Sequence, residues 1–342
     1  MTDDHWMHLA LAQARLGLGR TAPNPPVGAV VVSGADLLGS GWHHAAGQPH
    51  AEREALADAC ARHGAEAVRG ATVYVTLEPC STHGRTPPCT HGLIAAGVAR
   101  VVYACEDPNP DHAGRAADLL GAAGIAVTVG VCRDEAERLL RPFAKVRATG
   151  LPWVIWKTAM SLDGRITRPP GEGRWLTGPT ARDDVQRLRA TADAILTSGA
   201  TVRNDRPALT LRAPELLAGR AQPWRVVFSD APESLPRDAP LFTDEWRDRT
   251  LIRSGRDLAG ALRDLAREQG VLTAMTEAGG VFSAALLAAG LVDEVVIYCA
   301  PMLCGGPTLA LAGAHLPASL RLTETELTQL GDDFRIRGVL AR

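Results

Sequence analysis

Two cysteines lie on a short, proline-rich segment of the chain, PCSTHGRTPPC at residues 79–89. Eight residues separate Cys80 from Cys89, and such a pair could form a disulfide, bind a metal ion or be a coincidence. The seven cysteines of the chain are odd in number and scattered along it. The first residues carry acids where a signal peptide carries bases, so we expect a cytoplasmic protein with reduced thiols. A disulfide is therefore disfavoured.

Upstream of this segment, His50 and Glu52 could complete a metal site. The stretch PHAEREAL places both at the start of a predicted helix, directly after Pro49. A histidine there can present a ring nitrogen to a metal ion, and a glutamate two residues on can reach a metal-bound water without being a ligand. We expect Cys80 to follow a strand and Cys89 to begin a helix, whose N-terminus favours the deprotonated thiol that a metal needs.

One histidine and two cysteines give three ligands, which leave a fourth tetrahedral position open, as in a catalytic zinc site. Zinc lowers the pKa of a water at that position from ~15.7 to about 7. Glu52 could then carry the proton of this water to a ring nitrogen and to the leaving ammonia. The combination of H-x-E with P-C is typical of zinc-dependent nucleobase deaminases. A structural zinc module is the main alternative, but it would need a fourth protein ligand at short C-x-x-C spacing.

The elements that position these residues alternate between strands and helices, which predicts a layered α/β domain over residues 1–148. Strands are predicted at 27–33, 71–77, 99–105 and 124–130, and helices at 50–64 and 115–124. We place the domain boundary before Gly150 and Pro152, where a helical stretch turns.

A second α/β pattern fills residues 149–342. Strands are predicted at 153–161, 193–199, 224–230, 271–277 and 292–300, and helices at 179–191, 257–270 and 281–290. The proline-rich, polar segments 212–223 and 231–247 are predicted to be surface loops. In MTEAGGVFSAALL, Gly279 and Gly280 join a strand to a helix, where backbone amides could meet a phosphate. By itself this pattern is weak, because a glycine pair after a strand is more often only a turn.

Composition and charge narrow the class of partner. The chain has 342 residues, 46% of them hydrophobic, and a formal net charge of −2 with acids and bases mixed. No basic stripe suits a nucleic-acid backbone, and the longest weakly polar stretch is shorter than the ~18 residues that suggest a membrane span. We therefore expect a small-molecule substrate, no nucleic-acid or membrane partner, and a homo-oligomer with a dimer favoured.

Four motifs resemble a known family: PNPPVGAVVV (23–32), GWHHAAGQPHAE (41–52), TLEPCSTHGRTPPC (76–89) and SLDGRI (161–166). They are similar to the bifunctional riboflavin-biosynthesis enzymes that fuse a diaminohydroxyphosphoribosylaminopyrimidine deaminase to a 5-amino-6-(5-phosphoribosylamino)uracil reductase. The most specific mark is the eight-residue gap between the thiols, where general deaminases have C-x-x-C. The resemblance implies a cytidine-deaminase-like α/β/α domain with Zn²⁺, followed by a dihydrofolate-reductase-like α/β domain with NADPH.

In the first domain, the resemblance implies a pyrimidine ribosyl phosphate as substrate and hydrolytic loss of a ring amino group. It makes His50, Cys80 and Cys89 zinc ligands and Glu52 the catalytic acid and base. It also implies four substrate-binding residues: Asn24, His43, His83 and Arg85. One departure is visible, because the family usually has histidine at the position of Thr82, and here the histidine stands one place later.

In the second domain, the resemblance implies reduction of the ribosyl group to ribityl. Lys157, one of only two lysines, and Asp205 are candidates to support the protonation, and which of them transfers a proton stays open. Cofactor positions are Met160, Trp175, Thr201, Asp205, Asp230, Gly279, Gly280, Val281, Phe282 and Ser283. Substrate positions are Gly173, Arg189, Leu209, Arg212 and Glu277.

Two other classes of function remain open on the residues alone. One is a nucleic-acid or nucleoside deaminase with a C-terminal binding module, which the charge pattern and the eight-residue gap disfavour. The other is a noncatalytic scaffold in which the second half only oligomerises.

Overall fold

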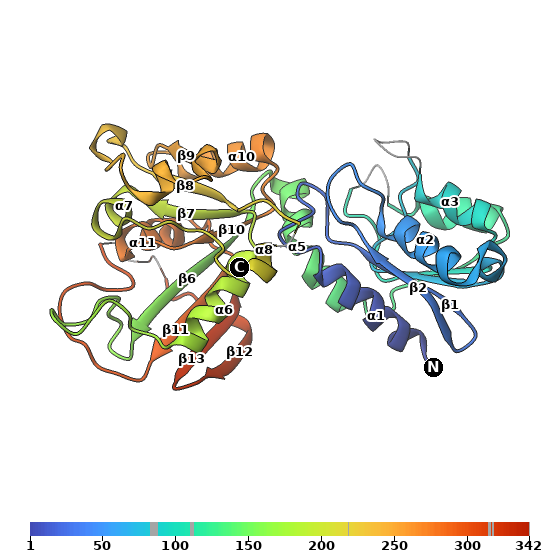
Figure 1. The fold of residues 1–342 in the computed structure, drawn as a ribbon, viewed down its shortest axis with the longest axis horizontal. Helices are drawn as coiled ribbons and strands as arrows, with labels where there is room; N and C mark the ends of the chain where they lie inside the picture. The colour runs from blue at the N-terminus through green and yellow to red at the C-terminus, as the bar shows by residue number, and fades with distance from the viewer. Residues whose placement is uncertain (83–87, 110–112, 218, 314–315, 317, 342) are drawn as a thin grey trace. The chain divides into compact units, whose positions relative to one another are not determined.

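The computed structural model describes residues 1–82, 88–109, 113–217, 219–313, 316 and 318–341. The chain divides into two compact units, Met1–Thr149 and Gly150–Arg342, and each is built around its own sheet (Figure 1). Among the described residues, no helix combines the length and apolar character needed to cross a membrane. The predicted α/β class is confirmed for both halves of the chain.

The first unit is a five-stranded sheet in the order β2-β1-β3-β4-β5. Its strands are β1 (Gly28–Ser33), β2 (Asp36–Trp42), β3 (Thr72–Val75), β4 (Arg100–Tyr103) and β5 (Ala126–Val129). Its helices are α1 (Asp3–Arg15), α2 (Ala51–His63), α3 (Cys89–Ala96), α4 (Arg115–Ala122) and α5 (Arg133–Thr149), with a 3₁₀ turn at Ala65–Val68. Strands β3, β4 and β5 are parallel, and β1 is antiparallel to both of its neighbours. The sequence did not predict β2.

Alternating side chains of the strands give this sheet two apolar faces. Val31 and Val73 pack with α2, α3 and α4 on one face, whereas Val30 and Tyr74 pack with α1 and α5 on the other. Helix α2 lies unusually close to β2, because a Cβ at Gly39 would stand 2.4 Å from a backbone nitrogen of the helix. This close contact fixes where α2 lies against β2, and two of the predicted site residues lie at the start of this helix.

The second unit is an eight-stranded sheet in the order β12-β13-β11-β6-β10-β7-β8-β9. Its strands are β6 (Trp153–Ser161), β7 (Ala194–Ser198), β8 (Trp224–Phe228), β9 (Thr250–Arg253), β10 (Thr273–Thr276), β11 (Glu294–Ala300), β12 (Leu322–Leu330) and β13 (Asp333–Leu340). Its helices are α6 (Pro179–Ala190), α7 (Gly199–Asp205), α8 (Pro214–Leu217), α9 (Pro240–Thr243), α10 (Leu258–Gln269) and α11 (Gly280–Ala288). The strands from β11 to β9 are parallel, and the β12–β13 hairpin adds an antiparallel edge.

Helices α10 and α11 cover one face of this sheet, and α6 covers the other. The predicted surface loops were wrong in part. Segment 212–223 contains α8, and segment 231–247 contains a 3₁₀ turn and α9. The second of these segments also contributes three buried side chains to a small core beside β8: Leu235, Ala239 and Leu241.

Candidate active sites

The predicted metal ligands meet at one point of the first unit. His50 immediately precedes α2, Cys80 follows β3, and Cys89 is the first residue of α3. One ligand atom of each residue lies within 4.8 Å of the others. The Nδ1 atom of His50 is 3.5 Å from Sγ of Cys80 and 3.3 Å from Sγ of Cys89. This set of one imidazole and two thiols fits zinc and leaves a tetrahedral position for water.

The two thiols share hydrogen bonds in the absence of a metal. The bond from the Cys89 thiol, helped by its backbone N–H at 3.2 Å, lowers the pKa of Cys80 to about 4. The same thiol–thiol bond raises the pKa of Cys89. Within this pair, the hydrogen bond therefore favours the thiolate at Cys80.

Glu52 lies in the first turn of α2 and is almost fully buried. Burial, followed by the charge of Cys80, raises the pKa of Glu52 to about 7. A carboxyl group that titrates near neutrality can both accept and donate a proton, which is the property required of a catalytic acid and base. Its place two residues after His50 keeps it beside the metal site without making it a ligand.

Asn24 and His43 form a second part of this site. Nδ2 of Asn24 donates to Nε2 of His43 at 2.9 Å, and Nδ1 of His43 donates to the carbonyl of Pro49 at 3.0 Å. Burial lowers the pKa of His43, in agreement with a neutral ring that donates on one side and accepts on the other. The His43 and His50 rings meet edge to face with centroids 5.3 Å apart. Asn24 is thereby oriented next to the metal ligands.

Glu78 is a residue of this region that sequence reasoning missed. It is buried, and its carboxylate accepts three backbone N–H bonds, from Asp107 at 3.1 Å and from Gly114 and Ala116 at 3.0 Å. It holds both ends of the connection between β4 and α4 beside the segment that leads to Cys80. The available signal was an acid directly after an apolar strand, in LEPC.

In the second unit, three predicted residues form a buried ionic cluster. Glu277, just after β10, accepts from Nε of Arg189 at 2.5 Å and from Nη2 of the same guanidinium at 3.0 Å. Nζ of Lys157, on β6, lies 3.6 Å from Oε2 of Glu277. Burial opposes ionisation of the carboxyl, but the charges of Arg189 and Lys157 lower the pKa of Glu277 to about 2. Burial also lowers the pKa of Lys157, which makes its ammonium a better acid.

Lys157 also faces a second network that the sequence did not reveal. Its Nζ lies 5.7 Å from the ring centroid of Tyr298 on β11, a cation–π distance. The hydroxyl of Tyr298 donates to Asp184 on α6 at 2.7 Å, and Nη1 of Arg335 donates to the same carboxylate at 2.9 Å. Tyr298 and Asp184 are both buried, so these hydrogen bonds hold the Tyr298 ring in place beside Lys157.

The start of α11 offers backbone donors to a phosphate. Gly279 precedes the helix, no side chain caps it, and the N–H of Gly279 is bound by Oγ1 of Thr201 at 3.2 Å. A Cβ at Gly279 would meet nothing within 4 Å, whereas one at Gly280 would stand 2.2 Å from the carbonyl oxygen of Leu309. The open space at Gly279 and the uncapped amides fit a dinucleotide phosphate. At Gly280, by contrast, glycine is needed because the backbone of Leu309 passes too close for a side chain.

Comparison with known proteins decides the family. Residues 1–105 match the family model for the cytidine and deoxycytidylate deaminase zinc-binding region, and residues 152–336 match that for the RibD C-terminal domain. The chain is 43% identical over 371 residues to the riboflavin biosynthesis protein RibD of Escherichia coli, covering 97% of this chain and 98% of the relative. It is 41% identical over 363 residues to RibD of Haemophilus influenzae, covering 97% and 95%. The chain belongs to the RibD family.

Solved structures of RibD proteins have the same fold over nearly the whole chain. Acinetobacter baumannii RibD, form 1, is 38% identical with a TM-score of 0.86 and covers 99% of both chains. A Thermotoga maritima structure, described as a diaminohydroxyphosphoribosylaminopyrimidine deaminase/5-amino-6-(5-phosphoribosylamino)uracil reductase, is 30% identical with a TM-score of 0.85. It covers 99% of this chain and 98% of its own.

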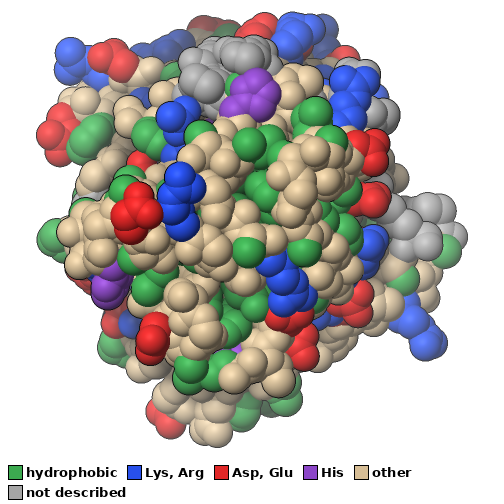
Figure 2. Space-filling model, turned by 90° about the vertical axis from the view of Figure 1, so that its right-hand side faces the viewer, with side chains coloured by type: hydrophobic (Ala, Val, Ile, Leu, Met, Phe, Trp, Pro, Cys, Tyr) green, Lys and Arg blue, Asp and Glu red, His purple; other side chains and the backbone are tan. Residues whose placement is uncertain are grey.

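This chain is therefore a bifunctional deaminase and reductase of riboflavin biosynthesis that uses zinc and NADPH. It is an enzyme with a small-molecule substrate. The alternative of a nucleic-acid deaminase is not favoured. On the face of the molecule in Figure 2, acidic and basic side chains are interspersed, and its described residues form no continuous basic area.

The remaining residues predicted from the RibD resemblance are spread around the second unit. Trp175 is half-exposed between the guanidinium groups of Arg174 and Arg182, whose carbons lie 5.3 and 5.4 Å from its ring centroid. Asp205 is exposed at the end of α7, and the described interactions do not join its side chain to Lys157.

Two other predicted cofactor positions, Phe282 and Ser283, make packing or hydrogen-bond contacts within the fold. Met160 is half-buried at the end of β6, Ser283 is buried with its hydroxyl on the carbonyl of Gly279 at 3.2 Å, and Phe282 stacks on Phe228. Val281 is exposed on the same helix turn.

Backbone geometry distinguishes two of the predicted substrate positions. Leu209 and Gly173 have positive φ angles of 54° and 92°. Leu209 is buried against α6, and Gly173 is exposed. The backbone N–H of Arg212 is held by Oε1 of Gln186 at 3.0 Å. The predicted deaminase residues His83 and Arg85 lie outside the described residues.

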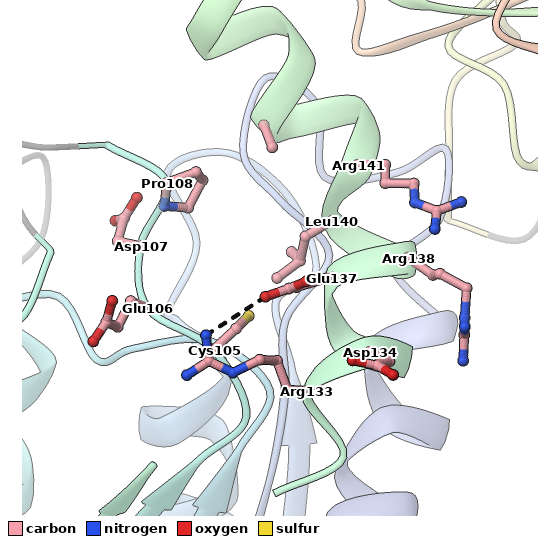
Figure 3. A pocket seen from close by; sticks show the side chains of 11 residues that line it. Cys105, Glu106, Asp107, Pro108, Arg133, Asp134, Glu137, Arg138, Leu140 and Arg141 are labelled. Carbon is pink, nitrogen blue, oxygen red and sulfur yellow. Dashed lines mark ion pairs between the residues drawn. The ribbon is translucent and has the colours of Figure 1, made fainter. Parts of the chain in front are cut away.

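A pocket of about 640 Å³ in the first unit contains none of the predicted site residues (Figure 3). It lies between the segment after β4, Cys105–Pro108, and helix α5. Cys105 and Leu140 belong to the core beneath α1 and α5, whereas α2 and α3 carry the metal ligands on the opposite face of the sheet. Its charged lining includes an ion pair of Arg133 and Glu137 at 3.7 Å. This pocket is therefore separate from the deaminase site.

Proposed function

We propose that the first unit deaminates 2,5-diamino-6-(5-phosphoribosylamino)pyrimidin-4-one and that the second reduces the ribosyl side chain of the deaminated product to ribityl. The single observation that carries the proposal is the convergence of His50, Cys80 and Cys89 in a chain that matches RibD proteins over almost its full length. The activities by which the Thermotoga maritima protein is described support the choice of substrate.

In the deaminase step, His50, Cys80 and Cys89 would hold zinc, which supplies a water of lowered pKa when it is bound. The Glu52 carboxylate would take one proton from the attacking water and deliver it to the ring nitrogen. It would then pass a second proton, from the hydroxyl of the tetrahedral adduct, to the departing amine, which leaves as ammonia. A titration range near neutrality suits this double role. The burial of Glu52 also keeps competing solvent away from the proton.

Asn24 and His43 position the substrate in this proposal. The amide of Asn24 can donate to and accept from a pyrimidine edge, and His43 fixes its orientation through the 2.9 Å hydrogen bond. His83 and Arg85 would contact the ribosyl phosphate from the segment between the two thiols. His83 would take the place of the family histidine that is replaced by Thr82 in this chain.

In the reductase step, NADPH supplies the hydride when it is bound. The sugar opens to an imine whose carbon receives the hydride, and Lys157 would donate the proton that the imine nitrogen takes up, which its lowered pKa supports. Asp205 remains a second candidate for proton transfer. Glu277 contacts two cations, Lys157 and Arg189, and its single charge neutralises only one of them. Arg189 and Arg212 would therefore provide positive charge for the substrate phosphate.

We further infer that the enzyme is a cytoplasmic homodimer. Three exposed apolar side chains of the C-terminal segment support an interface there: Leu320, Leu327 and Phe334. Sedimentation of the purified enzyme at micromolar concentration tests the dimer, and a monomer would contradict it.

The whole proposal is tested in one reaction. Purified enzyme with zinc, NADPH and the diaminopyrimidinone phosphate should release ammonia and then oxidise NADPH, and omission of NADPH should leave ammonia release unchanged. Ammonia is measured by an enzymatic assay and NADPH by absorbance. Release of no ammonia from this substrate by the zinc-loaded enzyme would overturn the proposal.

A further inference from the structure

The carboxyl edge of the eight-stranded sheet fixes the direction in which the cofactor runs. Strands β6, β10, β7, β8 and β9 are neighbours in that order and are all parallel. The ionic cluster of Lys157, Arg189 and Glu277 lies at β6 and β10, so the nicotinamide must come close to these two strands. Because strands are ~4.8 Å apart, β9 lies roughly 14 Å from β10 along this edge. With the phosphates at Gly279 after β10 and at Thr201 after β7, the adenosine half of an extended dinucleotide would lie toward β8 and β9.

A polar turn stands at that place. Asp230 follows β8, and Ser254, Gly255 and Arg256 follow β9. Oδ1 of Asp230 accepts from the hydroxyl of Ser254 at 2.6 Å and from the N–H of Gly255 at 2.9 Å. The hydroxyl of Ser254 also accepts from the N–H of Arg256 at 3.2 Å. The two bonds to Asp230 hold the turn against the end of the neighbouring strand, and the third fixes the turn internally.

Charge at this turn is unusual for a site that binds NADPH. A carboxylate at the end of a strand suits the free ribose hydroxyls of NADH and repels the 2′-phosphate of NADPH. Here the Asp230 carboxylate is already engaged by two donors, and Nε of Arg256 lies 3.9 Å from its Oδ1. The Arg256 side chain is 83% exposed, so its guanidinium keeps donors for a ligand.

The other charged groups near this turn are committed elsewhere. Arg253 donates to the carbonyl of Ile252 and pairs with Glu268 at 3.6 Å, and Asp257 caps α10 by accepting from the N–H of Gly260. The cation that remains oriented by the turn is Arg256.

We propose that the turn of Ser254, Gly255 and Arg256 recognises the 2′-phosphate of NADPH, with the Arg256 guanidinium pairing with the phosphate and Asp230 holding the turn in place. This inference rests on the proposed cofactor site at the carboxyl edge. Arg256 is then the residue that makes the reductase prefer NADPH to NADH, because a guanidinium binds a phosphate through paired N–H donors.

The test measures binding rather than turnover. Dissociation constants for NADPH and for NADH are obtained by fluorescence titration of the full-length, zinc-loaded enzyme and of Arg256→Ala. We expect the variant to bind NADPH about tenfold more weakly and to bind NADH as the wild type does. Arg267→Ala is the matched control, because Arg267 is an exposed arginine on α10 that pairs with Asp264 and Glu268. It should change neither constant.

A second probe isolates the phosphate. Adenosine 2′,5′-diphosphate should displace NADPH from the wild type more effectively than ADP does, and Arg256→Ala should remove this difference. Equal weakening of NADPH and NADH, or no weakening of either, would overturn the assignment. Arg203 lies on α7. If Arg203→Ala, and not Arg256→Ala, lost the preference for NADPH over NADH, the 2′-phosphate site would lie at α7 and the assignment to Arg256 would be overturned as well. Failure of the wild type to bind NADPH would instead refute the proposed cofactor site itself.

Discussion

The two active sites of this chain solve the problem of buried charge in opposite ways. In the deaminase site, the ligand atoms of His50, Cys80 and Cys89 lie within 4.8 Å of one another, where a zinc ion would balance the charge of two thiolates. In the reductase site, Lys157 and Glu277 already neutralise each other, and Arg189 adds a second cation. The charge balance of the first site therefore depends on its metal, whereas that of the second is reached among its own side chains.

This difference predicts which site should fail when one residue changes. Removal of a thiol takes away a bond to an ion that no neighbouring group can replace. Removal of one charge from the ionic cluster leaves its partners buried without compensation, so stability should suffer together with activity.

The largest effect is expected at the metal ligands. Cys89→Ser should lose bound zinc and reduce ammonia release to background, because serine is a poor zinc ligand. Glu52→Gln should keep about one zinc per chain yet lower ammonia release roughly 10³-fold, because only the proton carrier is removed. Metal content is measured by atomic emission, and activity by ammonia release. Loss of zinc in Glu52→Gln would show that Glu52 is not a mere proton carrier.

A smaller effect is expected at Glu277, where stability is affected. Glu277→Gln leaves Lys157 and Arg189 without a counter-charge and should lower the free energy of unfolding by about 3 kcal/mol at pH 7. The pKa of Glu277 is about 2 in the fold, below the ordinary carboxyl value, so this stabilisation is present above pH 4.5. It should disappear as the pH falls toward 2. Urea denaturation at pH 7, 4 and 3 measures it.

The matched control for this experiment is Glu268→Gln. Glu268 is about half exposed and pairs with Arg267 at 3.1 Å, so its replacement should cost less than about 1 kcal/mol at every pH. An equal loss in the two variants would show that the Glu277 cluster is no stronger than a surface ion pair.

The smallest effect separates the two glycines before α11. Gly280→Ala should lower the free energy of unfolding by about 2 kcal/mol, because its new Cβ would overlap the carbonyl oxygen of Leu309. Gly279→Ala should leave the free energy of unfolding unchanged, because its methyl group would enter space that is open in the fold. It should weaken the binding of NADPH, because the proposed phosphate site would use the same space. Thermal melts and NADPH titrations distinguish the two, and equal melting temperatures would contradict the assignment.

The sequence predicted the deaminase site well because its signals are local. His50 and Glu52 are two residues apart, and the thiols lie in one short segment, so spacing alone indicated zinc chemistry. The contacts of Glu78 with a connection some thirty residues away carried no such signal. The reductase cluster joins β6, α6 and the end of β10, and no spacing relates these elements, so only the family resemblance pointed to its members.

Most strands that the sequence predicted are apolar and buried, although the half-exposed β5 was predicted as well. Strand β12 escaped prediction because most of its side chains are exposed and polar, in LTETELTQL. Strand β9 is only four residues long and half-buried throughout. The segment 231–247 was read as a loop because of its prolines, yet it buries Leu235 and Leu241.

The central claim is that one chain carries two chemically independent sites, and a pair of variants tests it most directly. Glu52→Gln should release ammonia roughly 10³-fold more slowly but should oxidise NADPH at the wild-type rate when it is given the deaminated intermediate. Lys157→Ala should release ammonia at the wild-type rate but should oxidise NADPH about a hundredfold more slowly. If either variant lost both activities, the two sites would depend on one another and the account would be contradicted.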